Sequence, residues 1–213
     1  MKIEEEKLID ELRKVLSNGL PGVKSQLKAA PPFRANSFTD KDVMEARKAS
    51  VVFIIYPHDN KWEGVLIKRA SYDGVHSKQI AMPGGEREPG DASDLETAIR
   101  ECEEEIGVSL VKAQIIGTLS PLYIPPSRFF VRPYLAYLNA KPQFNIDPKE
   151  VGEVLFVSLE RLCSDNLWAE FEIKGNKVPG FELDGNVVWG ATAMMLAEIS
   201  DCCRDIFRDT FAT

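Results

Sequence analysis

The sequence RECEEEIGV at residues 100–108, preceded by PGG at residues 83–85, decides the fold of this 213-residue chain. The apolar residues in and before this segment recur at helical intervals and define one face: Leu95, Ala98, Ile99, Cys102 and Ile106. Glu101, Glu104 and Glu105 fall together elsewhere on the same helix, where neighbours three and four apart lie about 5–6 Å from each other. The segment therefore predicts an amphipathic helix with three carboxylates beside its buried face.

Three ionised glutamates this close repel one another unless a cation lies among them. Hard oxygen ligands grouped in this way suit Mg²⁺ or Mn²⁺. A solvated acidic face is the usual interpretation of an isolated run of glutamates. The upstream pair Gly84-Gly85 and the arginine inside the run, Arg100, favour the metal site here.

The segment resembles the signature of the Nudix hydrolases, G-x5-E-x7-R-E-U-x-E-E-x-G-U, in which U is an aliphatic residue. From Arg100 onward the match is nearly complete, with Cys102 at an aliphatic position, where a buried thiol behaves as a small hydrophobe. Counted from Gly85, five residues lead to Asp91, where the family has Glu, and eight residues rather than seven separate Asp91 from Arg100. In the family this acid and the arginine orient the catalytic glutamates. The shortened acid and the extra residue therefore make the Asp91–Arg100 contact the feature to test.

The resemblance implies a loop-helix-loop unit that binds the metal of a phosphoanhydride hydrolase. It implies an α/β (α+β) fold, the Nudix αβα sandwich with a mixed sheet. Glu101, Glu104 and Glu105 would hold Mg²⁺ or Mn²⁺, with the backbone carbonyl of Gly84 as a further ligand, and Arg100 joins the three glutamates as a catalytic residue. The identity of the base varies across the family, so Glu101 is assigned as ligand or base and Glu105 as ligand.

One extra residue at this place is typical of a subgroup, the coenzyme A pyrophosphatases. Its upstream motifs resemble L-L-T-x-R-S and H-x-G-Q-x-x-F-P-G-G, and this chain reads LIKRA at residues 66–70 and HSKQIAMPGG at residues 76–85. Three residues ahead of the glycine pair are in register: Arg69, His76 and Gln79. Three others stand where arginine, glycine and phenylalanine are usual: Gly74, Lys78 and Met82.

Further matches at residues 127–133, 150–154 and 188–193 extend the resemblance to about residues 50–200. The subgroup implies hydrolysis of the pyrophosphate bond of coenzyme A or acyl-CoA, giving 4'-phosphopantetheine and adenosine 3',5'-bisphosphate. The departures at Gly74, Lys78 and Met82 keep ADP-ribose or another nucleoside diphosphate derivative as an alternative substrate. A Nudix-fold binding module without turnover is disfavoured, because such modules lose glutamates that this chain retains.

The resemblance assigns substrate binding to four residues: Arg69, His76, Lys78 and Gln79. For Arg69, at the end of a strand, a phosphate contact and a surface ion pair are equal alternatives. His76 would otherwise be structural. Arg128 and Arg132 are weaker candidates, with Lys78, for the 3'-phosphate of coenzyme A.

Two acids and one tryptophan outside the signature have open roles. Glu150 or Glu153 would supply an additional carboxylate, although a solvated loop or the first turn of a helix is the favoured interpretation of both. Trp189 is expected to pack at the entry of the last helix rather than to form an adenine platform.

The net charge of -7, with 33 acidic and 26 basic residues, argues against sequence-independent binding to nucleic acid or an anionic membrane. The N-terminus lacks the apolar core of a signal peptide, and no stretch approaches the roughly 20 apolar residues of a membrane span, so we expect a cytoplasmic protein. The four cysteines show no C-x-x-C pair or disulfide framework, and adjacent Cys202 and Cys203 are expected on a helix, one inward and one outward. A homodimer is expected by family analogy only.

The chain divides into an N-terminal addition, residues 1–42, and a Nudix hydrolase domain, residues 43–213. The addition contains an amphipathic helix over residues 3–17 and an arm over residues 18–40 without a clear period. In the signature helix, expected over residues 93–106, Asp91 or Ser93 would cap the start and Gly107 would end it. The remaining elements are expected as strands at 50–56, 63–68, 114–119, 130–137 and 154–157, a hairpin over 168–183, a strand at 187–189 and a helix over 191–207.

Overall fold

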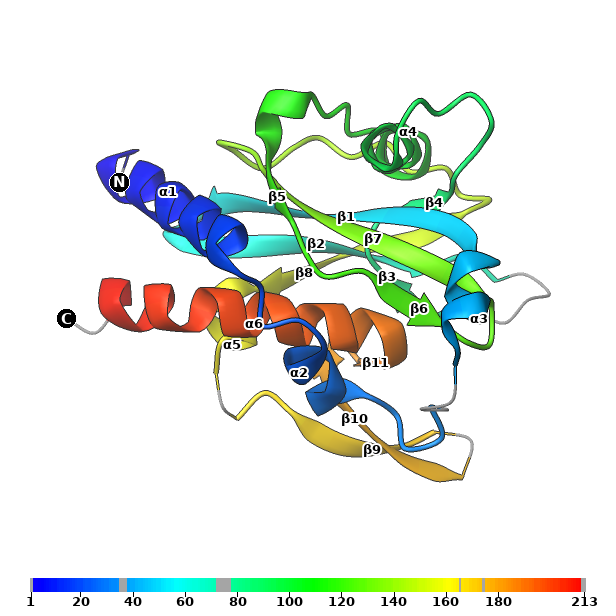
Figure 1. Cartoon of the computed structure of the whole chain (residues 1–213). Helices are drawn as coiled ribbons and strands as arrows, with labels where there is room; N and C mark the ends of the chain where they lie inside the picture. The colour runs from blue at the N-terminus through cyan, green and yellow to red at the C-terminus, as the bar shows by residue number, and fades with distance from the viewer. Residues whose placement is uncertain (1, 35–37, 72–77, 165, 174, 212–213) are drawn as a thin grey trace.

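The computed structural model describes residues 2–34, 38–71, 78–164, 166–173 and 175–211. At its centre is a mixed sheet in which β3, β2, β1, β7 and β5 lie side by side, while β4 pairs with β1, β6 with β7 and β8 with β2 (Figure 1). The β1–β7 pair is parallel and the other pairs are antiparallel. The strands are β1 Arg47–His58, β2 Lys61–Arg69, β3 Ile80–Ala81, β4 Gly84–Glu86, β5 Ile115–Thr118, β6 Leu122–Ile124, β7 Phe129–Tyr137 and β8 Val151–Ser158.

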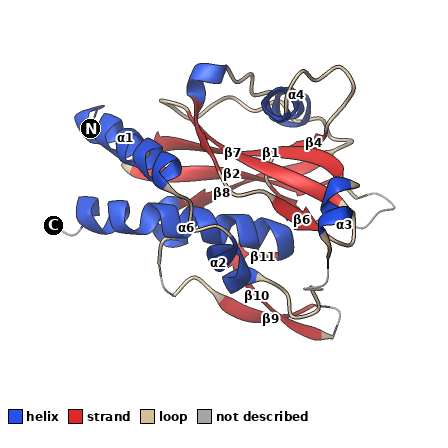
Figure 2. Ribbon diagram, viewed as in Figure 1, coloured by secondary structure: helices blue, strands red, loops and turns tan. Residues whose placement is uncertain are grey.

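Helices cover both faces of this sheet (Figure 2). The signature helix α4, Asp94–Ile106, lies on one face, and α1, Lys2–Asn18, and α6, Gly190–Phe211, lie on the other. In β1, Val52 and Ile54 belong to the core under α4, whereas Phe53 and Ile55 belong to the core under α6. A strand buried on both faces reads as a continuous apolar run, which is how β1 appears in the sequence. The predicted αβα sandwich is confirmed.

A smaller sheet, in the order β11-β10-β9, lies on the far side of α6 from the central sheet (Figure 1). Its strands are β9 Ala169–Ile173, β10 Asn176–Leu183 and β11 Asn186–Trp189. Because α6 is enclosed between these layers, Cys202 and Cys203 are both buried. The expectation that one of these cysteines faces outward was wrong. Short helical elements complete the chain: α2 Val23–Gln26, η1 Leu27–Ala29, α3 Asp40–Met44, η2 Lys112–Gln114 and α5 Leu159–Leu162.

The N-terminal arm packs against α6 through a buried carboxylate. Glu198, fully buried on α6, accepts hydrogen bonds from the Gly22 amide (3.1 Å), the Gln26 side-chain amide (3.1 Å) and the Ser120 amide (3.3 Å). The Lys28 ammonium adds an ion pair to Asp201 one turn later. These contacts place α2 and η1 where the sequence showed no periodic pattern.

The sequence division at residue 42 falls inside α3. Apolar residues of the addition, including Leu8, Ile9 and Leu12, belong to the same core as the sheet.

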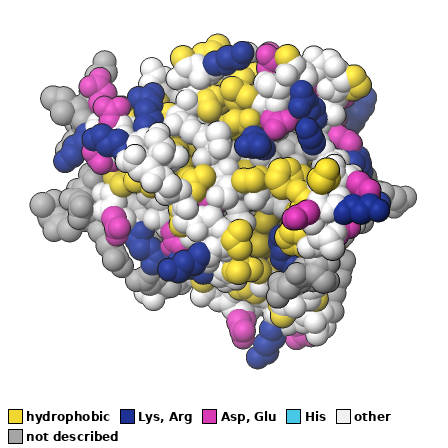
Figure 3. Space-filling model, in the orientation of Figure 1, with side chains coloured by type: hydrophobic (Ala, Val, Ile, Leu, Met, Phe, Trp, Pro, Cys, Tyr) yellow, Lys and Arg dark blue, Asp and Glu magenta, His cyan; other side chains and the backbone are white. Residues whose placement is uncertain are grey.

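Hydrophobic side chains also gather at the surface, in the middle of the face shown in Figure 3. Among the helices of the described ranges, none is long and apolar enough to cross a membrane.

Candidate active site

Local sequence sets the ends of α4. Ser93 is its N-cap, and the Ser93 hydroxyl accepts a hydrogen bond from the Glu96 amide at 3.2 Å. Gly107 adopts the left-handed conformation, with φ of 70°, and its amide donates to the Glu103 carbonyl at 2.9 Å. Of the two caps expected, the structure uses Ser93, which leaves Asp91 free for another contact.

The two glycines before α4 allow a close approach of three elements. A Cβ on Gly84, whose φ is 148°, would lie 2.2 Å from the Ser50 carbonyl oxygen of β1. A Cβ on Gly85 would lie 2.4 Å from the Glu101 carboxylate on α4. Glycine at these two positions therefore lets β4 lie between β1 and the first glutamate of the signature without displacing either.

Asp91 and Arg100 form the contact that the altered spacing had left open. The Arg100 guanidinium donates to both Asp91 oxygens, at 2.9 and 3.0 Å, and the Thr97 hydroxyl donates to the same carboxylate at 2.9 Å. The hydrogen bonds from Arg100 hold the pKa of Asp91 well below its usual range. Arg100 also donates to the Glu86 carbonyl at 3.1 Å, so it joins the loop, β4 and α4. The shortened acid therefore still reaches the arginine despite the extra residue between them.

Glu101, Glu105 and Glu150 bring their carboxylates together, with ligand oxygens within 4.8 Å of one another. Glu105 is fully buried, and each of its oxygens has a fixed donor: the Gly84 amide at 2.8 Å and the Arg69 guanidinium at 3.1 Å. The Glu101 carboxylate is paired with the Arg100 guanidinium at 2.9 Å.

Burial dominates the electrostatics of Glu101 and Glu105. It raises the pKa of Glu105 to about 7 and raises the pKa of Glu101, and the neighbouring carboxylates add to both effects. Arg69 and the Gly84 amide oppose the rise for Glu105 but do not cancel it. Convergent carboxylates whose charge is this costly fit a hard divalent cation such as Mg²⁺ or Mn²⁺.

Glu150 enters the group through sheet pairing. Val151, the first residue of β8, pairs with Arg69 at the end of β2, and the Ala70 amide donates to the Glu150 carbonyl at 2.8 Å. Glu153 lies within β8 opposite Lys68 and outside the carboxylate group. The expected solvated loop is confirmed for Glu150, which is exposed in the turn before β8. It was wrong for Glu153, which lies within that strand, and neither residue starts a helix.

Glu104 has a more peripheral position than the other two signature glutamates. Its side chain is 56% exposed, pairs with the Arg100 guanidinium at 2.8 Å and lies outside the group of three carboxylates. It nevertheless lines the same cavity as Glu101.

The four residues assigned to substrate binding have different environments. Arg69 lines the cavity and forms an ion pair with the buried Glu105, and Gln79 lines the cavity as well. Lys78 is exposed and is not a lining residue, and His76, like Gly74, lies outside the described residues. The weaker candidates Arg128 and Arg132 form ion pairs with Glu45 and Asp94.

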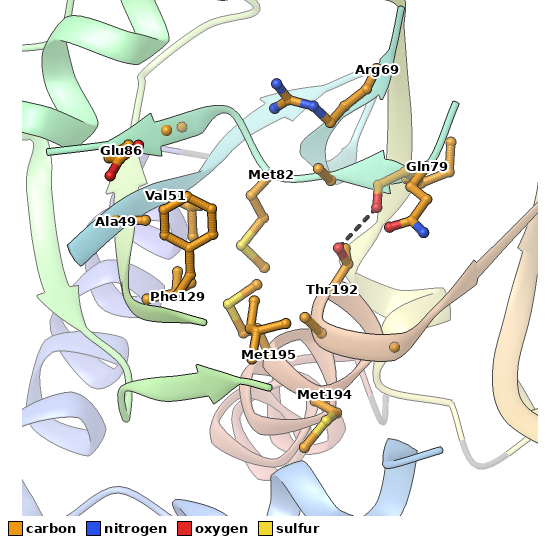
Figure 4. Close-up of a pocket in the computed structure, with 18 of the residues that line it drawn as sticks. Ala49, Val51, Arg69, Gln79, Met82, Glu86, Phe129, Thr192, Met194 and Met195 are labelled. Carbon is orange, nitrogen blue, oxygen red and sulfur yellow. Dashed lines mark hydrogen bonds between the residues drawn. The ribbon is translucent and has the colours of Figure 1, made fainter. Parts of the chain in front are cut away.

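Glu101, Glu104 and Glu150 line a cavity of about 820 Å³, and the fully buried Glu105 is not part of its lining. Other walls are apolar: Figure 4 shows Met82 and Met195 between Arg69 on one side and Met194 on the other. The close-up also shows the Thr192 hydroxyl donating to the Ile80 carbonyl at 2.9 Å, which fixes the start of α6 against β3.

Aromatic residues and the N-terminal arm complete the wall. Trp189 lines the cavity, and its ring meets that of Phe33 edge to face with centroids 6.5 Å apart. Pro31 and Arg34 of the same arm also line it. The sequence contained no periodic signal that placed these arm residues at the site.

A family model, the NUDIX domain, matches residues 46–176, well over half of the chain. The chain belongs to the Nudix family. Similar proteins include the uncharacterized Nudix hydrolase NudL of Pectobacterium atrosepticum, 28% identical over 165 residues, which are 75% of this chain and 84% of that protein. The NudL protein of Photorhabdus laumondii is 27% identical over 140 residues, 64% of this chain and 74% of that protein.

The solved structures agree on the fold. The crystal structure of a MutT/nudix family protein from Enterococcus faecalis superposes with a TM-score of 0.59, at 14% identity, over 92% of this chain and 74% of that one. The expectation of a Nudix hydrolase with the Nudix fold is therefore confirmed.

Proposed function

We propose that this Nudix hydrolase cleaves the pyrophosphate bond of coenzyme A or acyl-CoA in a reaction that depends on Mg²⁺ or Mn²⁺. The products are 4'-phosphopantetheine, acylated where the substrate was, and adenosine 3',5'-bisphosphate. The observation that carries the proposal is the carboxylate group of Glu101, Glu105 and Glu150, of which Glu101 and Glu150 line a cavity that also has apolar walls. The coenzyme A subgroup motifs, of which Arg69 and Gln79 line that cavity, support the choice of substrate.

The metal ligands in this proposal are Glu101, Glu105 and Glu150, with Glu104 and the Gly84 carbonyl as further ligands. A bound divalent ion would neutralise charge on the pyrophosphate oxygens and lower the pKa of a coordinated water. The protein's part is to hold the carboxylates. Both Glu105 oxygens already have donors, and the Asp91–Arg100 contact holds α4 against the loop and β4.

In the proposed reaction the oxygen of water bonds to one phosphorus, and the bridging oxygen leaves with the other phosphoryl group. A carboxylate accepts the proton of that water. We assign this role to Glu101, as base or ligand, because its side chain is partly exposed to the cavity whereas Glu105 is fully buried. The apolar walls exclude bulk water and would pack against the pantetheine arm or its acyl chain.

ADP-ribose or another nucleoside diphosphate derivative is the second candidate. Its pyrophosphate bond would be cleaved in the same reaction, but the group attached to the pyrophosphate differs. The position of Lys78 outside the cavity lining favours it, because that residue does not then contribute to a coenzyme A site.

A substrate panel separates these candidates: coenzyme A, acetyl-CoA, ADP-ribose, NADH and diadenosine tetraphosphate, each assayed with Mg²⁺ or Mn²⁺. We expect the largest kcat/KM for a coenzyme A compound, and faster turnover of any other compound would refute that choice of substrate. Excess EDTA should abolish activity, and full activity in EDTA would refute the metal assignment.

The carboxylate assignment has a matched pair of variants on one helix. Glu105→Gln should lower kcat by at least about 100-fold while substrate still binds. Glu103→Gln is the control, because Glu103 is exposed on the same helix and lies outside the cavity lining. Equal activity of the two variants would contradict the proposed site.

A further inference from the structure

Arg34 brings a positive charge from the N-terminal arm to the cavity wall. It ends a turn in which the Arg34 amide donates to the Pro31 carbonyl at 2.9 Å, and its side chain is partly buried. The guanidinium donates to the Tyr123 carbonyl at 2.7 Å and approaches the Met194 sulfur at 3.0 Å. Both partners are neutral, so neither compensates the charge.

The cavity is lined by three arginines among the described residues, and Arg34 differs from the other two. Arg69 is paired with Glu105, and Arg100 is paired with Asp91, Glu101 and Glu104. Within the described ranges, no carboxylate lies at ion-pairing distance from Arg34. Burial lowers the pKa of Arg34, which reflects the cost of placing a charge in this apolar surrounding.

Five N–H donors are available on a guanidinium, and the contacts to Tyr123 and Met194 leave some of them for a ligand. The planar fork of arginine matches a phosphate or a carboxylate. In Figure 4, Met195 lies between Arg69 and Met194. Because Arg34 contacts Met194, its guanidinium lies at a part of the wall separate from the Arg69–Glu105 pair.

The arm is held firmly enough to present this side chain. The Glu198 carboxylate and the Lys28–Asp201 ion pair fasten the preceding segment to α6, and Ala29 of that segment is completely buried. These contacts, with those of Arg34 itself to Tyr123 and Met194, place the guanidinium at the cavity wall.

We propose that Arg34 forms an anion subsite that binds a phosphate or carboxylate carried by the substrate arm lying on the apolar wall. The identity of that arm rests on the proposed function, whereas the subsite itself does not. In a coenzyme A substrate the anion would be the 3'-phosphate or a carboxylate at the end of an acyl group.

Two pairs of substrates distinguish these sources: coenzyme A against 3'-dephospho-coenzyme A, and succinyl-CoA against butyryl-CoA. Arg34→Gln should raise KM by about tenfold, with kcat unchanged, for the charged member of one pair and not for its neutral partner. Arg34→Lys should recover part of the loss. Arg13→Gln, which removes an exposed arginine of α1 outside the cavity lining, should have no effect. No change in any substrate, or equal losses in both members of both pairs, would overturn the proposal.

A binding measurement tests the subsite even if coenzyme A compounds are not substrates. The probes are 8-anilinonaphthalene-1-sulfonate, an apolar anion, and N-phenyl-1-naphthylamine, which is neutral. Arg34→Gln should weaken binding of the sulfonate by at least about threefold and leave the neutral probe unchanged, with Arg13→Gln like the wild type. Equal sulfonate affinity in the wild type and Arg34→Gln would refute the subsite, whereas absence of coenzyme A turnover would refute only the proposed function.

Discussion

Replacing Gly85 by alanine should damage the active site without unfolding the protein. The added Cβ would lie 2.4 Å from the carboxylate of Glu101, whereas an ordinary contact begins at 3.4 Å. The backbone angles of Gly85 lie outside the region that strains other residues, so alanine fits the chain itself. The far end of the Glu101 side chain must therefore move.

The size of the effect follows from that displacement. The carboxylate has to retreat by 1.0 Å, the difference between 3.4 and 2.4 Å. A misplacement of about 1 Å at a reacting group costs about 100-fold in rate, or about 2.7 kcal/mol of transition-state stabilisation. Because a flexible side chain yields rather than the backbone, the melting temperature should change by no more than about 3 °C.

The assay is metal-dependent hydrolysis of the best substrate in the panel, together with thermal unfolding of the same preparations. Gly90→Ala is the matched control, since Gly90 precedes α4 in the same loop and a Cβ there would meet nothing within 4 Å. This control should keep wild-type activity. Gly84→Ala should instead reduce stability, because its Cβ would meet a backbone oxygen and its φ of 148° is strained for alanine.

Wild-type kcat/KM in Gly85→Ala would refute the reasoning, because it would show that the position of the Glu101 carboxylate does not matter. Loss of folding in Gly85→Ala would contradict it in another way, by showing that Glu101 cannot yield.

Four further predictions concern protonation, the Asp91–Arg100 contact and the N-terminal arm. Because the pKa of Glu105 is about 7 in the metal-free protein, Mg²⁺ affinity should rise as the pH increases from 5 to 7 and then level off. Calorimetry in two buffers should detect the proton that Mg²⁺ binding releases. An affinity independent of pH would contradict this prediction. The stability of the metal-free protein should instead fall as the pH rises from about 4.5 to 7, as measured by urea titration. The reason is that the folded state binds the Glu105 proton more tightly than the unfolded chain does. Asp91→Asn removes the charge that pairs with Arg100 and should lower the free energy of unfolding by about 1–3 kcal/mol and kcat by about tenfold; an unchanged melting curve and rate would show that the contact has no role. Glu198→Ala leaves three hydrogen-bond donors without their acceptor and should lower the free energy of unfolding in urea by about 3 kcal/mol. A loss below about 0.5 kcal/mol would contradict this prediction.

The sequence itself determined the features that depend on neighbours along the chain. The apolar spacing and the Ser93 cap and Gly107 stop specify α4, and the signature identifies the reaction class. The continuous apolar run of β1 likewise indicates a strand covered on both faces, because each of its sides needs a hydrophobic partner.

Tertiary structure decided which residues meet across the chain. Glu150 joins Glu101 because β8 pairs with the end of β2, a pairing that local spacing does not encode. Arg34 reaches the cavity because Glu198 and its partners dock an arm that has no periodic pattern. Local spacing determines what shares one helix face, whereas contacts between distant segments depend on the packing of the whole chain, and in this protein that packing decides the third carboxylate and the cationic part of the wall.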